Sequence, residues 1–329
     1  MAANLKRILT TSSLSPAGRA VLGSRDNIEL VEFPHHLTGE DFQNLLREHA
    51  PVHAVVLGAT RMTQAELDAA GDMNVVARVG VGYDAIDIPT MTKNKVPVMI
   101  AGTANSPSVA EQALFMMLNL AKRATELDSM VRENRWNDRF TAVPFDLFEK
   151  EVLVVGFGRI GSRTAKRCNA MEMKVHVYDP YKSDEEIGSA GCIVVKDLDA
   201  AVAQADFISI HCPKTPDTLN MFDADRIGRM KPTAYLVNTA RGGIVNETAL
   251  YAALVEKKIA GAGLDVLELE PPSEDNPLMK LDSVLLAPHM AGVTKEAMSR
   301  MGEAAAKNIL SVFDGVPTRE NMINPEVLD

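Results

Sequence analysis

Short apolar runs alternate with amphipathic stretches along the first hundred residues. The runs are rich in Val, Ile and Leu, which favours β-strands, and they cover residues 8–10, 28–33, 52–57, 75–79 and 96–100. Between them, residues 40–48 and 64–70 carry apolar side chains at helical spacing. Strands that alternate with helices in this way predict a parallel sheet flanked by helices.

A long helix is predicted from Ser108 to about Val131. Apolar residues dominate this segment, and Ser108 precedes Glu111 by three residues, as in a capping box. Because the segment is apolar on all sides, we expect it to be buried between domains or subunits.

A second alternation of apolar runs and helical segments begins at Glu151. Strands are expected at 152–155, 174–178, 207–210, 234–237, 261–264 and 284–286, with a helix over 160–170. A last helix is expected over 295–313, and the tail that follows is rich in Gly, Pro and Asn. The pattern predicts a second complete α/β unit.

Length and composition narrow the class of protein. A chain of 329 residues predicts two domains rather than a single core. Its formal net charge of −10 opposes binding to nucleic acid or anionic lipid, because both need clustered Lys and Arg. No apolar run is long enough for a membrane span or a secretion signal. Three cysteines without CxxC spacing suit a reducing compartment, so we expect a cytoplasmic protein.

The strongest local motif contains three glycines, Gly156, Gly158 and Gly161, directly after the run VLVV and at the start of a helical segment. The first glycine permits a tight turn, the second lets the backbone approach a pyrophosphate, and the third lets helix and strand pack closely. The helix N-terminus then offers N–H groups and a positive dipole end to the phosphates. In this strand and helix context the motif predicts a dinucleotide site.

Asp179 ends the next predicted strand, 18 residues after Gly161. At that place an aspartate accepts hydrogen bonds from the adenosine ribose and repels a 2′-phosphate, which favours NAD over NADP. The alternative interpretation is a turn aspartate before Pro180.

Three later segments add polar groups just beyond predicted strands, at the edge where open α/β sheets bind ligands. They contain Arg241, Glu270 and His289, from the segments NTARGG, DVLELEP and PHMAG. Alone, each residue has an ordinary structural explanation: a surface ion pair, a turn, or a buried histidine. Together beside a nicotinamide they supply a cation for a carboxylate and a proton donor for a developing alkoxide, as reduction of a 2-oxo acid requires.

With these motifs in this order, the chain resembles the D-isomer-specific 2-hydroxyacid dehydrogenases over nearly its whole length. The resemblance also includes GVGYDAID from Gly80, SVAE from Ser108, HCP from His211 and the closing Asn324-Pro325. It implies that Arg241 anchors the substrate, that Glu270 orients the histidine, and that His289 is the general acid and base. It further implies that the backbone N–H groups of Val81 and Gly82 bind the substrate carboxylate, although that loop could instead be only a tight turn.

The resemblance assigns NAD as the cofactor and names the residues that hold it. Backbone amides of Arg159 and Ile160 would bind the pyrophosphate, and Asp265 would hold the nicotinamide carboxamide. The full expected set is Gly156, Gly158, Arg159, Ile160, Gly161, Asp179, His211, Cys212, Pro213, Thr239, Ala240, Arg241, Asp265 and His289.

The fold class implied is α/β, with two doubly wound parallel-sheet domains and a cleft between them. Residues 1–103 and 295–329 would form a flavodoxin-like substrate domain, and residues 104–294 a Rossmann NAD-binding domain. Members of the family are typically homodimers joined through an arm, here about 108–145. Trp136 on that arm would either reach the neighbouring active site or fill the dimer core.

Departures from the family pattern bear on the substrate. The run Ile100-Ala101-Gly102-Thr103 replaces the usual Asn-x-Pro-Gly, which puts the hinge geometry there in doubt. Leu57 stands where phosphoglycerate-oxidising relatives commonly carry an arginine, which argues against phosphoglycerate unless Arg61 or Arg78 compensates. A small unphosphorylated acid such as glyoxylate, hydroxypyruvate or pyruvate is therefore the expected substrate.

Two other functions stay open at this point. One is a D-3-phosphoglycerate dehydrogenase that lacks a regulatory domain, and the other is an NAD-sensing binding protein like the corepressors of the same family. A metal site is not expected, because His35 and His36 lie in a predicted loop and neither HExxH nor paired cysteines occur.

Overall fold

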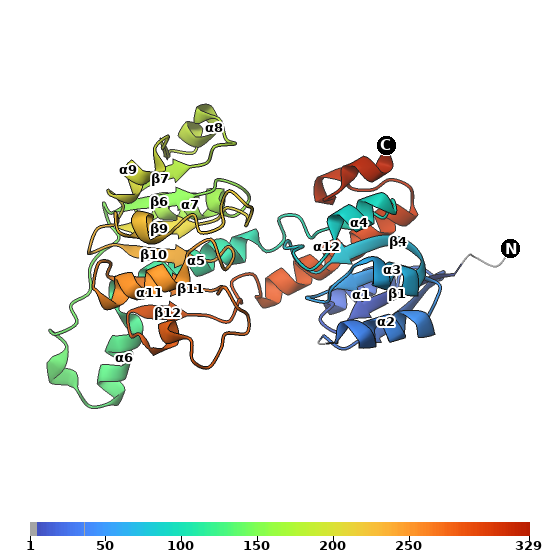
Figure 1. Cartoon of the computed structure of the whole chain (residues 1–329), viewed down its shortest axis with the longest axis horizontal. Coiled ribbons are helices and arrows are strands. Elements are labelled where there is room, and N and C mark those ends of the chain that lie inside the picture. The colour runs from blue at the N-terminus through green and yellow to red at the C-terminus, as the bar shows by residue number, and fades with distance from the viewer. Residues whose placement is uncertain (1–4, 36) are drawn as a thin grey trace. The chain divides into compact units, whose positions relative to one another are not determined.

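The computed structural model describes residues 5–35 and 37–329, and it contains two compact units (Figure 1). Unit 1 holds the described residues up to Asn105 together with Gly292–Asp329, and unit 2 holds Ser106–Ala291. These limits lie within three residues of the expected ones. The functional names given to the two domains stay predictions.

Unit 1 is built on a parallel sheet in the order β2-β1-β3-β4-β5. The strands are β1 Lys6–Thr11, β2 Ile28–Phe33, β3 Val52–Leu57, β4 Gly71–Arg78 and β5 Val98–Met99. The helices are α1 Pro16–Leu22, α2 Gly39–Glu48, α3 Gln64–Ala70, α4 Ile88–Lys93 and α12 Lys295–Phe313. After β2 is added on one side of β1, the next strand, β3, is added on the other side, so β1 and β3 form a topological switch point. Ligands are expected at the carboxyl ends of these two strands.

Alternate side chains of the unit 1 strands enter two separate cores. On β3, Val55 and Leu57 pack with α2, α3 and α4, whereas Ala54 and Val56 pack with α1 and α12. Successive strand residues point to opposite faces, so a strand buried on both sides reads as a continuous apolar run. Helices therefore cover both faces of the sheet.

Unit 2 is built on a longer parallel sheet in the order β12-β11-β10-β9-β6-β7-β8. The strands are β6 Glu151–Val155, β7 Lys174–Tyr178, β8 Ile193–Val194, β9 Phe207–Ile210, β10 Tyr235–Asn238, β11 Gly261–Leu264 and β12 Val284–Leu286. The helices are α5 Ser106–Lys122, α6 Ala124–Arg132, α7 Gly161–Ala170, α8 Asp184–Ser189, α9 Leu198–Val202, α10 Ala224–Ile227 and α11 Glu247–Val255. Strands β7 and β8 are added on one side of β6, and β9 to β12 are added on the other side, so β6 and β9 form the topological switch point.

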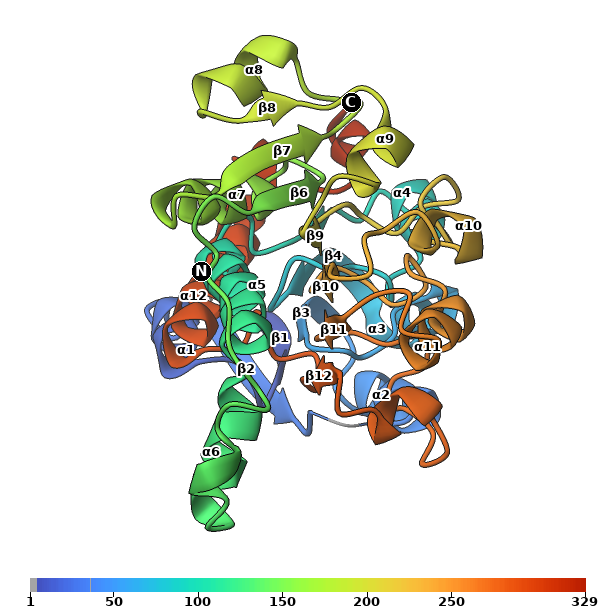
Figure 2. The same cartoon turned by 90° about the vertical axis from the view of Figure 1, so that its left-hand side faces the viewer.

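Figure 2 shows the layers of unit 2, with α5 and α7 on one face of the sheet and α9, α10 and α11 on the other. Val152 and Val154 of β6 pack against the first face, and Leu153 and Val155 against the second. Two parallel sheets, each covered by helices on both faces, confirm the predicted fold class.

The long helical stretch expected from Ser108 to about Val131 is helical but not continuous. Two helices occupy the segment, and they are separated at Arg123, whose φ of 50° is left-handed. The first helix already begins at Ser106, so Ser108 lies inside it and is buried rather than forming a capping box. One face of α5 packs in the core of unit 2 through residues such as Ala113 and Met116.

Short elements escaped the sequence pattern, among them α1, α4, α8, α9 and the two-residue strand β8. A helix of five to seven residues spans too few turns for a clear period. Within the described part of the chain, no helix combines the length and apolar character needed to cross a bilayer.

Candidate functional site

Most of the expected site residues of unit 2 follow the carboxyl ends of its strands. Gly156 follows β6, Asp179 follows β7, His211 follows β9, Thr239 follows β10 and Asp265 follows β11. In a parallel sheet these ends share one edge. The topology alone therefore gathers residues that are far apart in the sequence.

The glycine loop has the geometry that its spacing predicts. Gly156 has a φ of 93°, and a Cβ there would lie 2.7 Å from the backbone nitrogen of Cys212. A Cβ at Gly161 would lie 1.9 Å from the carbonyl oxygen of Gly156. No described atom lies within 4 Å of a Cβ added at Gly158, which leaves the space that a pyrophosphate needs. The backbone N–H groups of Gly158 and Ile160 also have no partner among the described residues.

Asp179 is fixed by two backbone groups. Its Oδ2 accepts a hydrogen bond from the N–H of Phe157 at 2.7 Å, and its Oδ1 accepts one from the N–H of Tyr181 at 2.8 Å. The bond from Tyr181 is of the kind expected for a turn aspartate, which was the alternative interpretation. The bond from Phe157 ties the carboxylate to the glycine loop. Each oxygen keeps a second lone pair, so the structural role does not prevent binding to a ribose.

The segment His211-Cys212-Pro213 packs against the glycine loop. His211 Nε2 lies 2.8 Å from the hydroxyl of Ser209, and its buried Nδ1 has no partner among the described residues. Burial lowers the pKa of His211 to about 3, so this imidazole is neutral. Burial raises the pKa of the Cys212 thiol to about 11, which keeps it protonated.

Thr239 is also buried, and its hydroxyl has no partner in the described part of the chain. A buried polar atom without a partner is unfavourable, and ligand sites are where such atoms are commonly found. Both Thr239 and His211 were expected to contact the cofactor. Together with the open side of Gly158, these atoms fit a bound dinucleotide.

Arg241 lies on a loop that a buried asparagine shapes. Asn238 Nδ2 donates to the carbonyl of Arg241 at 2.9 Å, and its Oδ1 accepts from the N–H of Ala240 at 3.0 Å. Arg241 Nη1 donates to the carbonyl of Ala240 at 2.7 Å. A Cβ at Gly242 would lie 1.8 Å from the carbonyl oxygen of Leu267, so this loop touches the one after β11.

Asp265 holds the loop that carries His289. Its Oδ1 accepts from the N–H of Met290 at 2.8 Å, and its Oδ2 accepts from the N–H of Ala291 at 2.9 Å. Its backbone carbonyl accepts from the N–H of His289, whose φ of 55° is left-handed. Burial raises the pKa of Asp265, and the hydrogen bonds from Ala291 and Met290 oppose that rise. The expected contact of Asp265 with a carboxamide stays a prediction.

Glu270 and His289, which are expected from the sequence to act together in proton transfer, are in hydrogen-bond contact. Glu270 Oε2 lies 2.7 Å from His289 Nδ1, and Oε1 accepts from the N–H of Leu267 at 3.0 Å. This pairing leaves Nε2 of the imidazole as the nitrogen for a substrate. The pair borders a pocket of about 460 Å³, whose other walls include Pro271, Met279 and Leu286.

In unit 1 the segment from Gly80 to Gly82 forms a loop after β4. The N–H groups of Val81 and Gly82 have no hydrogen-bond partner among the described residues. They are free to bind an anion, as the resemblance implies. Leu57, where an arginine was considered, is fully buried in the core of unit 1.

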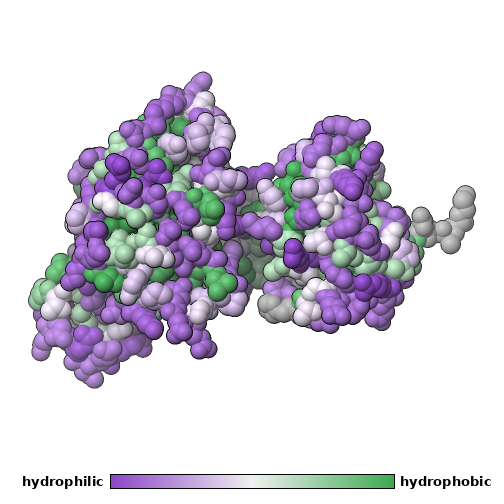
Figure 3. All heavy atoms as spheres, viewed as in Figure 1, coloured by the Kyte–Doolittle hydropathy of each residue, from purple (hydrophilic) through white to green (hydrophobic). Residues whose placement is uncertain are grey.

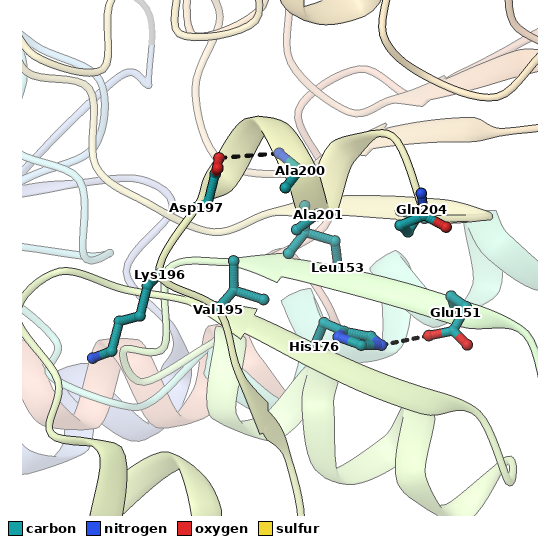
Figure 4. A pocket seen from close by; sticks show the side chains of 10 residues that line it. Glu151, Leu153, His176, Val195, Lys196, Asp197, Ala200, Ala201 and Gln204 are labelled. Atoms are coloured by element: carbon teal, nitrogen blue, oxygen red, sulfur yellow. Dashed lines mark hydrogen bonds and ion pairs between the residues drawn. The ribbon is translucent and has the colours of Figure 1, made fainter.

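A second pocket of unit 2, of about 280 Å³, lies between α9 and the strands β6 and β7 (Figure 4). Most of its charged side chains are already paired: His176 with Glu151, and Lys196 with Asp184. Asp197 caps α9 by accepting from the N–H of Ala200. None of the expected site residues lines this pocket.

No metal site is expected from the sequence. Among residues 5–35 and 37–329, no three His, Cys, Asp or Glu side chains gather as a metal ion would require. His35 lies in the expected loop region, and His36 is outside the described residues.

Two positioning functions were missed at the sequence level. Asn238 sets the course of the Arg241 loop, and Asp265 fixes the His289 loop. An asparagine directly before a turn is a recognisable signal for side-chain to backbone bonding. The bonds of Asp265 carry no such signal, because Met290 is 25 residues away.

Comparison with known proteins shows which family this chain is similar to. Residues 114–291 match the family model of the D-isomer specific 2-hydroxyacid dehydrogenase, NAD binding domain. A glyoxylate reductase of Thermofilum pendens is 38% identical over 292 residues, covering 87% of this chain and 85% of that protein.

A D-3-phosphoglycerate dehydrogenase of Archaeoglobus fulgidus is 39% identical over 291 residues, which are 88% of this chain and 55% of that protein. The chain thus spans little more than half the length of this relative. Among solved structures, D-lactate dehydrogenase of Aquifex aeolicus, complexed with NAD and lactic acid, is similar with a TM-score of 0.83 and 28% identity. The match covers 96% of this chain and 99% of that one.

Proposed function

Because this chain belongs to the D-isomer specific 2-hydroxyacid dehydrogenase family, we propose that it interconverts a small D-2-hydroxy acid and its 2-oxo acid with NAD. The observation that carries the proposal is the 2.7 Å contact between Glu270 and His289, because the loop of Glu270 also touches the loop of Arg241. When bound, the cofactor would supply a hydride as NADH in reduction and accept a hydride as NAD+ in oxidation.

The side chains of unit 2 then perform the remaining steps. The guanidinium of Arg241 binds the substrate carboxylate and carbonyl, because its planar fork can donate to two oxygens. Protonated His289 donates from Nε2 to the developing alkoxide in reduction, and the neutral imidazole takes the hydroxyl proton in oxidation. Glu270 keeps the ring oriented for both directions. In unit 1, the N–H groups of Val81 and Gly82 bind the substrate carboxylate.

The proposed cofactor site consists of the glycine loop, with Arg159 and Ile160 at the pyrophosphate, and Asp179 at the adenosine ribose. His211, Cys212 and Pro213 border the adenosine side, while Thr239, Ala240 and Asp265 border the nicotinamide. The unpartnered atoms of Thr239 and His211 support this assignment.

A substrate panel tests the reaction. The full chain should oxidise NADH with glyoxylate, hydroxypyruvate or pyruvate, and chiral analysis should find the D-isomer where the product is chiral. The variant His289→Gln should lose about 10²–10⁴-fold in kcat, as expected for a general acid, and still bind NADH. An enzyme that reduces none of these acids, or that forms the L-isomer, would contradict the proposal.

Phosphoglycerate is the second candidate, because several relatives carry that name. The buried position of Leu57 argues against it, since that residue offers no cation to a phosphate. We expect kcat/KM to be lower for D-3-phosphoglycerate oxidation than for D-glycerate oxidation at the same pH. The reverse order would favour the second candidate.

Selection of NAD over NADP is assigned to Asp179. Its carboxylate would repel a 2′-phosphate, so the parent enzyme should have a much higher kcat/KM with NADH than with NADPH. Asp179→Ser should lower the ratio of kcat/KM with NADH to kcat/KM with NADPH. The main cause should be a lower Kd for NADPH, which fluorescence titration can measure. Equal efficiency of the parent with both cofactors would remove Asp179 from this role.

We also propose a homodimer joined through the arm at about residues 108–145. Large apolar side chains are exposed along this segment, and Figure 3 shows green residues at the surface in the region of α6. Trp136 and Phe140 are 62% and 74% exposed, which is unfavourable unless another chain covers them. Sedimentation should show a dimer for the parent and for the control Val316→Asp, but a monomer for Phe140→Asp.

The role of Trp136 can be separated from dimer formation. If Trp136→Ala remains a dimer but raises KM for the 2-oxo acid, the side chain reaches a neighbouring site. If dimer formation is lost, the side chain belongs to the dimer core. A cytoplasmic location is proposed because the cysteines are unpaired, and cell fractionation can test it.

A further inference from the structure

The guanidinium of Arg78 joins two loops at the carboxyl edge of the unit 1 sheet. Arg78 is the last residue of β4, and its Nη1 donates to the carbonyl oxygen of Gly58, directly after β3. Its Nε donates to the carbonyl oxygen of Gly82 at 2.6 Å. One side chain therefore ties the turn after β3 to the loop of Val81 and Gly82.

The loop from Gly80 to Gly82 lies close to the guanidinium of Arg78. Gly80 has a φ of 149°, and a Cβ added there would lie 3.6 Å from Nη1 of Arg78. The carbonyl of Gly80 accepts from the N–H of Ala101 at 2.8 Å. The peptide groups that begin at Gly80 and at Gly82 are therefore both held through their oxygens.

Holding these oxygens orients the N–H groups of the loop. A peptide unit is planar and trans, so fixing the carbonyl of Gly80 also fixes the direction of the N–H of Val81. The N–H of Gly82 lies between the two held peptide groups. Neither N–H has a partner among the described residues, which is unfavourable unless an anion or water binds there.

We propose that Arg78 is a positioning residue for the substrate: by holding the carbonyl of Gly82, while Ala101 holds that of Gly80, it keeps the loop in the conformation in which the N–H groups of Val81 and Gly82 can bind the substrate carboxylate. Its fixed positive charge also lies beside the loop that receives this anion, which favours binding. The inference rests on the proposed function. It adds a residue that does not itself touch the substrate.

The same bonds restrict Arg78 as a phosphate ligand. Its Nε and Nη1 are engaged with backbone carbonyls, so using them for a phosphate would release the loop. Arg78 therefore cannot give both Nε and Nη1 to a phosphate while it holds the loop.

Kinetics of Arg78→Met and Arg78→Lys test the proposal. Arg78→Met should raise KM for the best 2-oxo acid by about tenfold or more, because charged hydrogen bonds to the loop are lost. kcat should fall less than KM rises, and Kd for NADH should stay unchanged because unit 2 is intact. Arg78→Lys keeps the charge but lacks the two-armed geometry, so its KM should lie between those of the parent and Arg78→Met.

Arg7→Met is the matched control. Arg7 is also a half-buried arginine of unit 1. It donates to Glu29 and to the carbonyl of His49, which are distant in sequence from the loop of Val81 and Gly82. It should lower Tm to a similar degree and leave KM unchanged.

An unchanged KM in Arg78→Met, or an equal rise in Arg7→Met, would overturn the proposal while the parent stays active. If Arg78→Met does not fold, Arg78→Lys decides by the same comparison, and failure of both to fold means a purely structural role. A parent enzyme that reduces no 2-oxo acid would instead contradict the proposed function.

Discussion

At His289 the backbone has a φ of 55°, a conformation that residues other than glycine seldom adopt. Three hydrogen bonds hold it there, all to Asp265: one to its carbonyl and two to its carboxylate. The imidazole thereby reaches Glu270, whose second oxygen is itself held by the N–H of Leu267. Each side chain in this series is oriented by a backbone group, which limits the freedom lost when substrate binds.

Replacing Glu270 by Gln tests this arrangement. Gln can keep the bond from Leu267 but loses the charge that faces His289, so kcat should fall by about ten- to hundredfold in both directions. Kd for NADH, measured by fluorescence, should change little. Glu274→Gln, in the same exposed segment, is the control and should behave like the parent. Equal kinetics of the parent and Glu270→Gln would show that another group orients His289.

Among the elements, the loops after parallel strands contain the candidate site, and close backbone contacts fix them. The loop of Gly242 touches Leu267, and the loop of Gly156 touches Cys212. Only glycine permits these approaches. Gly158 differs, because no described atom surrounds the position of its Cβ. This open space is what the proposed pyrophosphate site requires.

Gly158→Ala separates the two uses of glycine. The variant should fold with nearly unchanged Tm, because the added methyl meets no described atom, yet Kd for NADH should rise about tenfold or more as the methyl enters the pyrophosphate space. Gly188→Ala, on α8, is equally open and should bind NADH normally. By contrast, Gly161→Ala should destabilise the fold, since its Cβ would lie 1.9 Å from a carbonyl oxygen. Tight NADH binding by Gly158→Ala would place the cofactor elsewhere.

At the scale of the whole molecule, burial of His211 links the site to stability. In the unfolded chain a histidine has a pKa of about 6.5, whereas in the folded protein the pKa of His211 is about 3. Between these values the unfolded state binds a proton that the folded state does not. Stability from this residue is therefore complete above pH 6.5 and is lost as the pH falls toward 3, by at most about 1.4 kcal/mol per pH unit.

His211→Gln should reduce this dependence. Urea unfolding at pH 7 and pH 5 should show a smaller loss of unfolding free energy in the variant than in the parent. Gln can keep the bond to Ser209, so the variant should remain folded at pH 7. Equal losses in the two proteins would mean that His211 can be protonated in the folded state.

The sequence alone was sufficient for the fold class, the order of the strands along the chain and the residues at their carboxyl ends. Apolar period and turn residues are local signals, and strands such as Val52–Leu57 and helices such as Lys295–Phe313 match their predicted limits. The family resemblance is confirmed by the match of residues 114–291. Motif order sufficed for this, because parallel topology places consecutive strand ends on one edge.

Only the tertiary structure decided how these residues are held. No local sequence pattern signals three features of the structure. They are the left-handed residue Arg123 between two helices, the hydrogen bonds of Asp265 to the His289 loop, and the bonds of Arg78 to Gly58 and Gly82. Each depends on which backbone groups meet across loops that are distant in sequence. Local propensity describes one segment at a time, whereas hydrogen bonds between loops form only after the sheet has set their distance.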